Sequence, residues 1–183
     1  NRLGDSPEMS WITIVWSMMA SASLTLALLH LLIWFNQRRQ WAHLCLSITA
    51  VAVAVITGME FMGMRAVSIE QWSTLLRWVH LPLFIIYVAI VFYMRFYFNA
   101  GRLWLALTVC GLRALALLAS FTTGQSLFFR EITNLKYVAI FGGETISIPQ
   151  GVLNPFYIVG PLGMLALVLY VMDASISLWH RGT

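Results

Sequence analysis

Glu60, His80 and Arg113 are the three ionisable residues whose types and positions in apolar segments best suit a binding site. Glu60 lies four residues, His80 about five and Arg113 about eight from one end of their apolar segments. All three of these ends are predicted at the outer membrane surface. At 1.5 Å per residue, their depths are roughly 6, 8 and 12 Å. Because such a group costs at least ~2.5–3.5 kcal/mol in a membrane, each needs a partner or a function.

We therefore expect these residues to form one polar cluster in the outer half of the membrane. In one interpretation the cluster lines a small pocket that binds a ligand. In the other, Glu60 and Arg113 form a buried ion pair that holds helices together, and His80 is a hydrogen-bonding residue between helices. The sequence leaves both interpretations open.

A second polar pair is expected in the inner half. His30 and Asp173 lie about five or six residues from the inner ends of their segments, so their side chains are predicted to meet. His43 and His180 lie near the same face, which raises a bis-histidine haem as an alternative. The spacing supports haem weakly, because no two histidines share one helix face at metal-ligand spacing.

Copper is the other cofactor that the sequence raises. Met59, Met62 and Met64 flank Glu60, and their thioethers together with His80 are soft ligands suited to copper(I). Methionine packing explains them better in so apolar a chain, so we expect no cofactor and assign no metal site. The motifs of hydrolases, phosphate-binding loops and zinc clusters are absent from the sequence, so no catalytic residue is assigned and no intrinsic enzymatic activity is expected.

The composition defines the elements that must position these residues. Hydrophobic residues make up 60% of the 183 residues and charged residues only 10%, whereas about a quarter of a soluble domain is charged. The basic residues are scattered, as at the ends of membrane spans, which argues against nucleic acid as a partner. We predict an all-α integral membrane protein, one domain over 1–183, whose five transmembrane helices form a bundle in the lipid bilayer over about 10–35, 41–64, 75–98, 103–121 and 155–179.

The connection 122–154 is the only long one between the predicted helices. Two β-rich runs, 136–141 and 144–149, flank Gly142-Gly143 and predict a β-hairpin. Exposed strands cannot lie in hydrocarbon, so the hairpin should be extracytoplasmic and cap the helices. Gly160 and Pro161 are expected to kink the last span and to act as a hinge beside that cap.

The charges of the short connections predict the orientation. Five basic residues in short segments fall on the side of the 36–40 turn and three on the other side, which favours an outer amino terminus and a cytoplasmic carboxyl terminus.

Several stretches of the chain resemble the membrane region of bacterial sensor histidine kinases that carry PAS domains. Examples are Leu-Arg-Trp-Val-His at 76–80 and Gly-Glu-Thr-Ile-Ser-Ile at 143–148. Between Met9 and Gly182 the resemblance also rests on 9–22, 29–34, 110–118, 154–155 and 171–182.

The resemblance implies a sensory input module of a two-component kinase in the bacterial inner membrane, working as a homodimer. Its cytoplasmic kinase domains would belong to the same polypeptide and begin near Thr183. The sequence holds no phosphoacceptor histidine box or ATP-binding glycine motif, so this chain alone is not expected to phosphorylate anything. The resemblance does not identify the signal.

Two other functions remain open on the residues alone. One is a small anchor or electron-transfer subunit that holds haem or quinone. The histidines and the eight tryptophans favour this alternative. A copper-binding membrane sensor is the second alternative. A transporter ranks last, because the sequence contains no inverted repeat.

Overall fold

The computed structural model describes residues 11–123, 126–140 and 144–182 and is mostly helical. Five of its helical segments are long and apolar enough to cross a membrane, which confirms the predicted number of spans within that part of the chain. The helices are α1 (Trp11–Asn36), α2 (Trp41–Met64), α3 (Ile69–Trp78), α4 (His80–Phe98), α5 (Leu103–Thr122) and α6 (Val159–Gly182), the last preceded by the 3-10 turn η1 (Pro155–Ile158).

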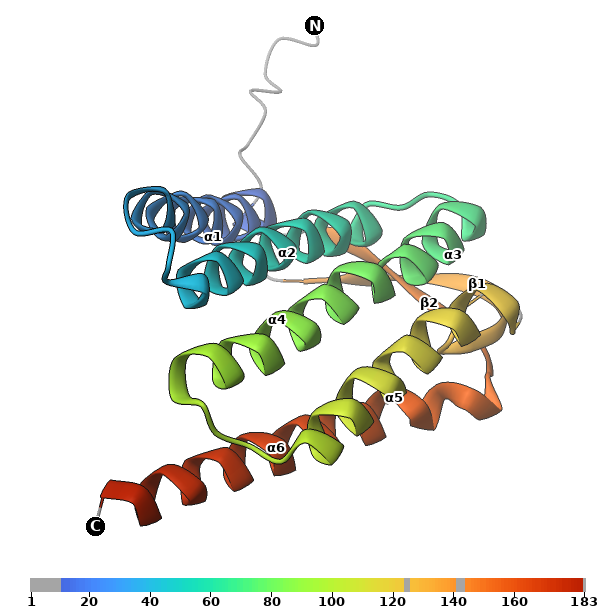
Figure 1. Ribbon diagram of the computed structural model, residues 1–183. Coiled ribbons are helices and arrows are strands. Elements are labelled where there is room, and N and C mark those ends of the chain that lie inside the picture. The colour runs from blue at the N-terminus through green and yellow to red at the C-terminus, as the bar shows by residue number, and fades with distance from the viewer. Residues whose placement is uncertain (1–10, 124–125, 141–143, 183) are drawn as a thin grey trace, which may run out of the picture.

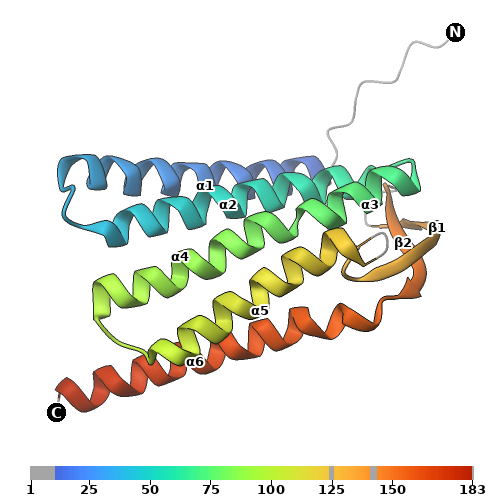
Figure 2. The ribbon, with the colours of Figure 1, turned by 45° about the vertical axis from the view of Figure 1, so that its right-hand side comes forward.

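The spans lie side by side in chain order. Figures 1 and 2 show α1, α2, α4, α5 and α6 as a row in which each helix packs against the next, with α1 and α6 at its two edges. The arrangement is therefore a row of helices, in which α4, α5 and α6 also form a three-helix cluster. Many large apolar side chains consequently point away from the protein, as expected for helices that face lipid.

Small residues bring neighbouring helices close together. Ala27 of α1 and Ala42 and Ala52 of α2 are buried, and the Ser47 hydroxyl of α2 donates a 2.8 Å hydrogen bond to the Ala27 carbonyl. Such contacts are typical of membrane proteins, because helices in lipid associate through close packing and not through the hydrophobic effect.

The largest buried cluster joins α4, α5 and α6. Val109 of α5 and Tyr170 of α6 are completely buried, and Tyr87 and Val91 of α4 pack with them. The Tyr170 hydroxyl donates a hydrogen bond to the Val91 carbonyl. These side chains hold the second half of the row together.

The third span begins earlier than predicted and is divided at Val79. Ser68 caps α3 by accepting a hydrogen bond from the Gln71 amide, so the stretch interpreted as a loop is a short amphipathic helix. Pro82 has no amide hydrogen for the Trp78 carbonyl, which explains the interruption between α3 and α4. Pro82 lies in the first turn of α4, where the missing amide hydrogen costs least.

The last span changes helix type at the place where the sequence predicts a kink. The chain enters α6 through η1, which Asn154 caps by accepting a hydrogen bond from the Phe156 amide. Pro161 is the third residue of α6 and lies in its first turn, so it offers no amide hydrogen to the Tyr157 carbonyl of η1.

The predicted β-hairpin is confirmed, with longer strands than expected. β1 (Phe129–Ala139) pairs antiparallel with β2 (Thr145–Leu153), and the Gly142-Gly143 turn lies outside the described residues. A register shift between Ile132 and Asn134 brings the β1 backbone close to Gly151, where an added Cβ would lie 2.0 Å from the Glu131 carbonyl oxygen. Only glycine fits at this bulge.

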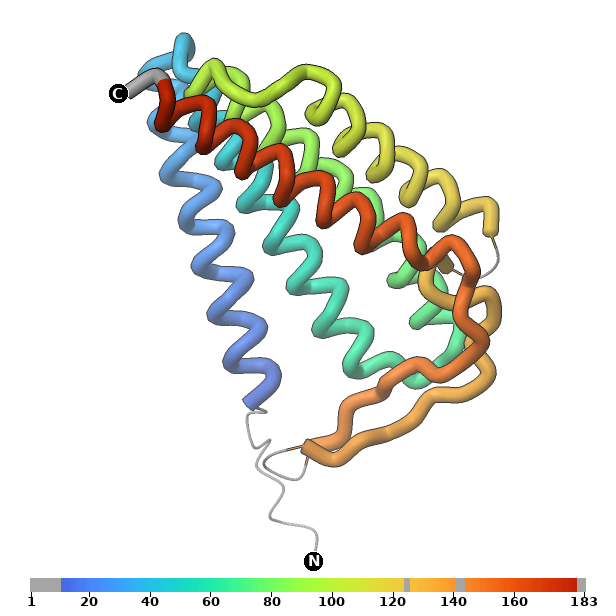
Figure 3. The backbone as a smooth tube through the Cα atoms, turned by 90° about the horizontal axis from the view of Figure 1, so that it is seen from below, coloured from blue at the N-terminus to red at the C-terminus, as the bar shows by residue number. Residues whose placement is uncertain are grey.

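The hairpin extends as a strap across one end of the row, which we call the hairpin side (Figure 3). Near its turn, the Glu144 carboxylate accepts a 2.8 Å hydrogen bond from the Trp11 amide at the start of α1. In the middle, Ser147 donates to the Gly63 carbonyl of α2. The other end, which holds the 37–40 and 99–102 connections and the end of α6, is the turn side.

The close contact at Gly151 yields a test of the hairpin. Gly151→Ala should lower the thermal unfolding midpoint in detergent micelles, at a cost of about 1–3 kcal/mol, because two backbone segments would have to separate. Gly111→Ala is the control: no atom lies within 4 Å of its added Cβ, and alanine favours the α5 helix. Equal midpoints for the two variants would contradict the bulge.

Candidate functional site

An open groove of about 490 Å³ lies between α2 and the α3–α4 segment on the hairpin side, and Phe128, just before β1, lies over it. We call it the Glu60 groove, because Glu60 is the only charged residue among those that line it. The remaining lining is apolar or aromatic: Ile56, Met59, Met64, Trp72, Leu75, Leu76, Val79, Leu83 and Phe128.

The three residues expected to form one cluster are divided between two places. Glu60 is exposed and lines the groove, whereas His80 and Arg113 are buried behind it, only 2% and 8% exposed. Among the described residues Glu60 makes no ion pair with Arg113. The ion pair that one interpretation of the sequence required is therefore not formed, because Arg113 is directed toward α4 and α6.

His80 is the least satisfied polar side chain near the groove. Its ring stacks on the Phe128 ring at a centroid distance of 5.6 Å, and Phe128 in turn lines the groove. Within the described part of the chain, neither ring nitrogen of His80 has a hydrogen-bond partner. An unpaired buried polar group costs ~1–3 kcal/mol of stability, so stability alone does not explain a histidine at this position.

Arg113 connects α5 with both neighbouring helices. Its Nη2 donates a hydrogen bond to the Tyr87 hydroxyl of α4, and its guanidinium carbon lies 3.8 Å from the centre of the Tyr87 ring. It also interacts electrostatically with His80. On the α6 side it packs against Gly163, where an added Cβ would lie 3.3 Å from Arg113 Nε.

Trp72 forms a rigid wall of the groove. Its Nε1–H donates a 2.8 Å hydrogen bond to the Ser147 hydroxyl of β2, which itself donates to the Gly63 carbonyl at 2.9 Å. Ser147 is buried, so this three-residue junction fixes α2, α3 and the hairpin relative to one another. Trp72 could not be predicted as a site residue from the sequence, because the junction joins residues far apart in the chain.

Asn154 anchors the base of the hairpin in the same way. Its side-chain amide donates to the Thr123 carbonyl at 2.7 Å and to the Ser126 carbonyl at 3.0 Å, while its oxygen caps η1. The end of α5, the start of β1 and the start of α6 thus meet at one buried side chain. Asn154 also holds Phe128 over the groove, because the backbone N–H of Asn154 donates a hydrogen bond to the Phe128 carbonyl.

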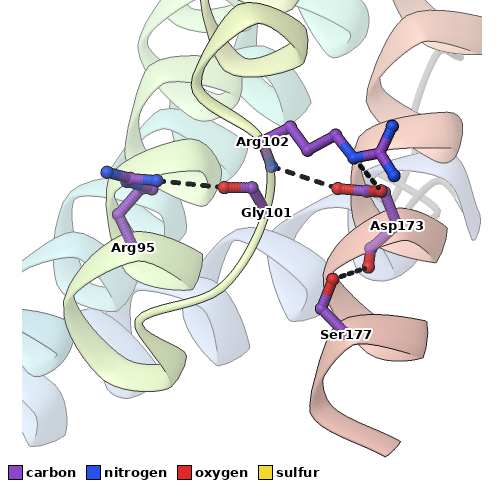
Figure 4. Close-up of polar contacts among 5 residues, drawn as sticks. All are labelled: Arg95, Gly101, Arg102, Asp173 and Ser177. Carbon is purple, nitrogen blue, oxygen red and sulfur yellow. Dashed lines mark hydrogen bonds and ion pairs between the residues drawn. The ribbon is translucent and has the colours of Figure 1, made fainter. Parts of the chain in front are cut away.

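On the turn side, Asp173 binds Arg102 and not His30 (Figure 4). One carboxylate oxygen accepts a 3.0 Å hydrogen bond from the Arg102 amide, and the other lies 3.2 Å from Arg102 Nε. Arg95 completes the contact by donating to the Gly101 carbonyl at 3.0 Å. The expected His30–Asp173 pair does not form, because α1 and α6 lie at opposite edges of the row.

His30 instead contacts His43 across the α1–α2 interface. Their Nδ1 atoms are 3.1 Å apart and their rings stack at 5.3 Å. A haem iron between two histidine nitrogens at roughly 2 Å each would need a separation near 4 Å, so this spacing suits a shared hydrogen bond better. His180 lies exposed on α6.

The residues considered for copper are separated as well. Met64 lines the Glu60 groove, whereas Met62 lines a neighbouring groove with Arg65 and Glu70, and His80 is buried behind Phe128. Among the described residues there is no group of three or more histidine, cysteine, aspartate or glutamate side chains that could hold a metal ion.

Five apolar spanning helices indicate a multi-pass membrane protein. No protein-family model matches the chain, and comparisons with curated proteins and with solved structures find no match.

The unpaired nitrogens of His80 generate a prediction about stability. His80→Leu should raise the thermal unfolding midpoint in micelles, with a gain of about 1–3 kcal/mol, because it removes two buried polar atoms that have no partner. His43→Leu is the matched control and should lower the midpoint, since it leaves His30 without its hydrogen bond. A loss of stability in both variants would show that His80 is a structural residue.

Proposed function

We propose that this chain is the membrane-embedded sensory input module of a two-component sensor histidine kinase of the bacterial inner membrane. The amino terminus is outside, and the carboxyl end leads to cytoplasmic kinase domains of the same polypeptide in a homodimer. The resemblance of its sequence to such modules supports this proposal. The observation that carries it is the buried, unpaired His80 stacked on Phe128, which lines an open groove.

The ligand in this proposal is a small molecule that reaches the Glu60 groove from the extracytoplasmic side or from the membrane. Binding can shift the protein only if the ligand prefers one arrangement of the helices. The Phe128 ring supplies such a preference in this proposal, because it lines the groove and stacks on His80.

From His80 the change passes to α6 through Arg113. The guanidinium is held by Tyr87 of α4 and packs against Gly163 of α6, so a displacement of His80 alters the position of α6 relative to α4. At the turn side the Arg102–Asp173 contact joins α6 to the α4–α5 connection, and α6 leads to the output. Pro161 marks the entry into α6 in this account and does not act as a hinge within it.

The alternative is a small anchor or electron-transfer subunit that binds haem or quinone. A Soret band in purified protein would favour haem binding over the sensor, and bound copper would favour a copper sensor.

The coding sequence beyond Thr183 tests the proposal most simply. We expect an uninterrupted reading frame that continues into PAS or histidine kinase domains. A stop codon directly after Thr183, or continuation into an unrelated domain, would contradict the sensor function.

Gly163 offers a test of the signal path within the parent kinase. Gly163→Ala should change basal autophosphorylation in membrane vesicles by about two- to thirty-fold, because the added Cβ forces Arg113 to move. Gly160→Ala, in the same helix, is the matched control: its Cβ would make an ordinary 3.9 Å contact with Leu127, a residue before β1. If both variants keep the original activity, Arg113 does not transmit the signal to α6.

A further inference from the structure

Glu60 brings a carboxylate into the apolar groove. Among the described residues the carboxylate has no ion-pair or hydrogen-bond partner, although it lies four residues from the end of α2 in an apolar groove. Uncompensated carboxylates are unfavourable at such a depth. The groove therefore favours an occupant that brings positive charge.

The nearby arginines are committed to other groups. Arg65 donates a 2.7 Å hydrogen bond to the Thr13 hydroxyl and lies 4.6 Å over the Phe61 ring. Arg113 is bound to Tyr87. Among the described residues neither arginine forms an ion pair with Glu60, so the groove can accept a complementary charge from an occupant.

The apolar lining of the groove favours a cation that carries apolar groups. Trp72 and Phe128 supply two aromatic rings, the side-chain type that attracts cations through its π face. The Trp72 ring is held in place by its hydrogen bond to Ser147, so part of the site is preformed. The volume of about 490 Å³ lies in the range for small organic ligands.

From this combination we infer that the Glu60 groove binds a lipophilic organic cation, whose charge lies against Glu60 and whose apolar groups contact the aromatic walls. The inference rests on the proposed function, because it names the ligand class of the same site. Its occupant is a free organic cation that enters from the membrane interface, and not the ammonium head group of a lipid.

Tetraphenylphosphonium is the probe, and tetraphenylborate is its control of similar shape and opposite charge. Equilibrium dialysis against the purified chain in phosphatidylcholine nanodiscs and in maltoside micelles, each with empty particles as blanks, should give saturable binding of one cation per chain. Glu60→Gln should weaken it by about tenfold or more, because it removes the charge but keeps the shape. Glu70→Gln, an exposed carboxylate of the neighbouring groove, should leave it unchanged.

Val79→Phe keeps the carboxylate but fills the groove, so it should also weaken binding. Equal binding of tetraphenylborate, or unchanged binding to a folded Glu60→Gln variant, would overturn the inference. Saturable binding in maltoside micelles that disappears in phosphatidylcholine discs would assign the groove to lipid head groups and overturn it too. These outcomes concern the membrane chain alone, so they are distinct from a failure of the kinase proposal, which the reading frame decides.

Discussion

The absence of water from a bilayer core constrains every part of this structure, because backbone and side-chain polar groups there must find partners inside the protein. The five helices satisfy their own backbones, and the hydroxyls of Thr25, Thr49 and Thr108 donate to carbonyls one turn earlier in the same helix. The two-stranded hairpin cannot satisfy its edges in this way, so it lies across the ends of the helices. Longer-range polar contacts occur on the hairpin side around Ser147 and Asn154 and on the turn side at Asp173. Others join neighbouring spans, at Ser47, Arg113 and Tyr170.

His80 is the clearest exception to this constraint, and the functional proposal depends on it. A protein that satisfies the buried Ser147 and Asn154 side chains so fully, yet leaves both nitrogens of His80 unpaired, carries a local cost that packing does not explain. Functional sites are where such costs are expected. In the proposed mechanism this cost has a role, because Phe128 joins His80 to the groove and Arg113 contacts α6 at Gly163.

The sequence predicted the elements well and their contacts poorly. Long apolar segments and the β-rich runs predict five spans and a hairpin, because length and periodicity are local properties. The early start of the third span, at Ile69, was missed since Ser68 and Gln71 were not interpreted as a helix cap, although that signal is present in the sequence. Depth along a helix placed Glu60, His80 and Arg113 at similar levels, but depth does not determine which way a side chain points. Phe128, Tyr87 and Gly163 join the candidate site only through the order of the helices, which periodicity does not reveal.

In the proposed mechanism, a ligand bound in the Glu60 groove moves α6 relative to the rest of the row. Spin labels on the exposed Phe35 of α1 and Ile176 of α6, in a background without Cys45 and Cys110, report this movement as an interlabel distance by pulsed electron resonance in nanodiscs. Saturating tetraphenylphosphonium should shift the interlabel distance distribution in the original protein and not in the Glu60→Gln variant. An unchanged distribution in protein that demonstrably binds the cation would contradict this mechanism.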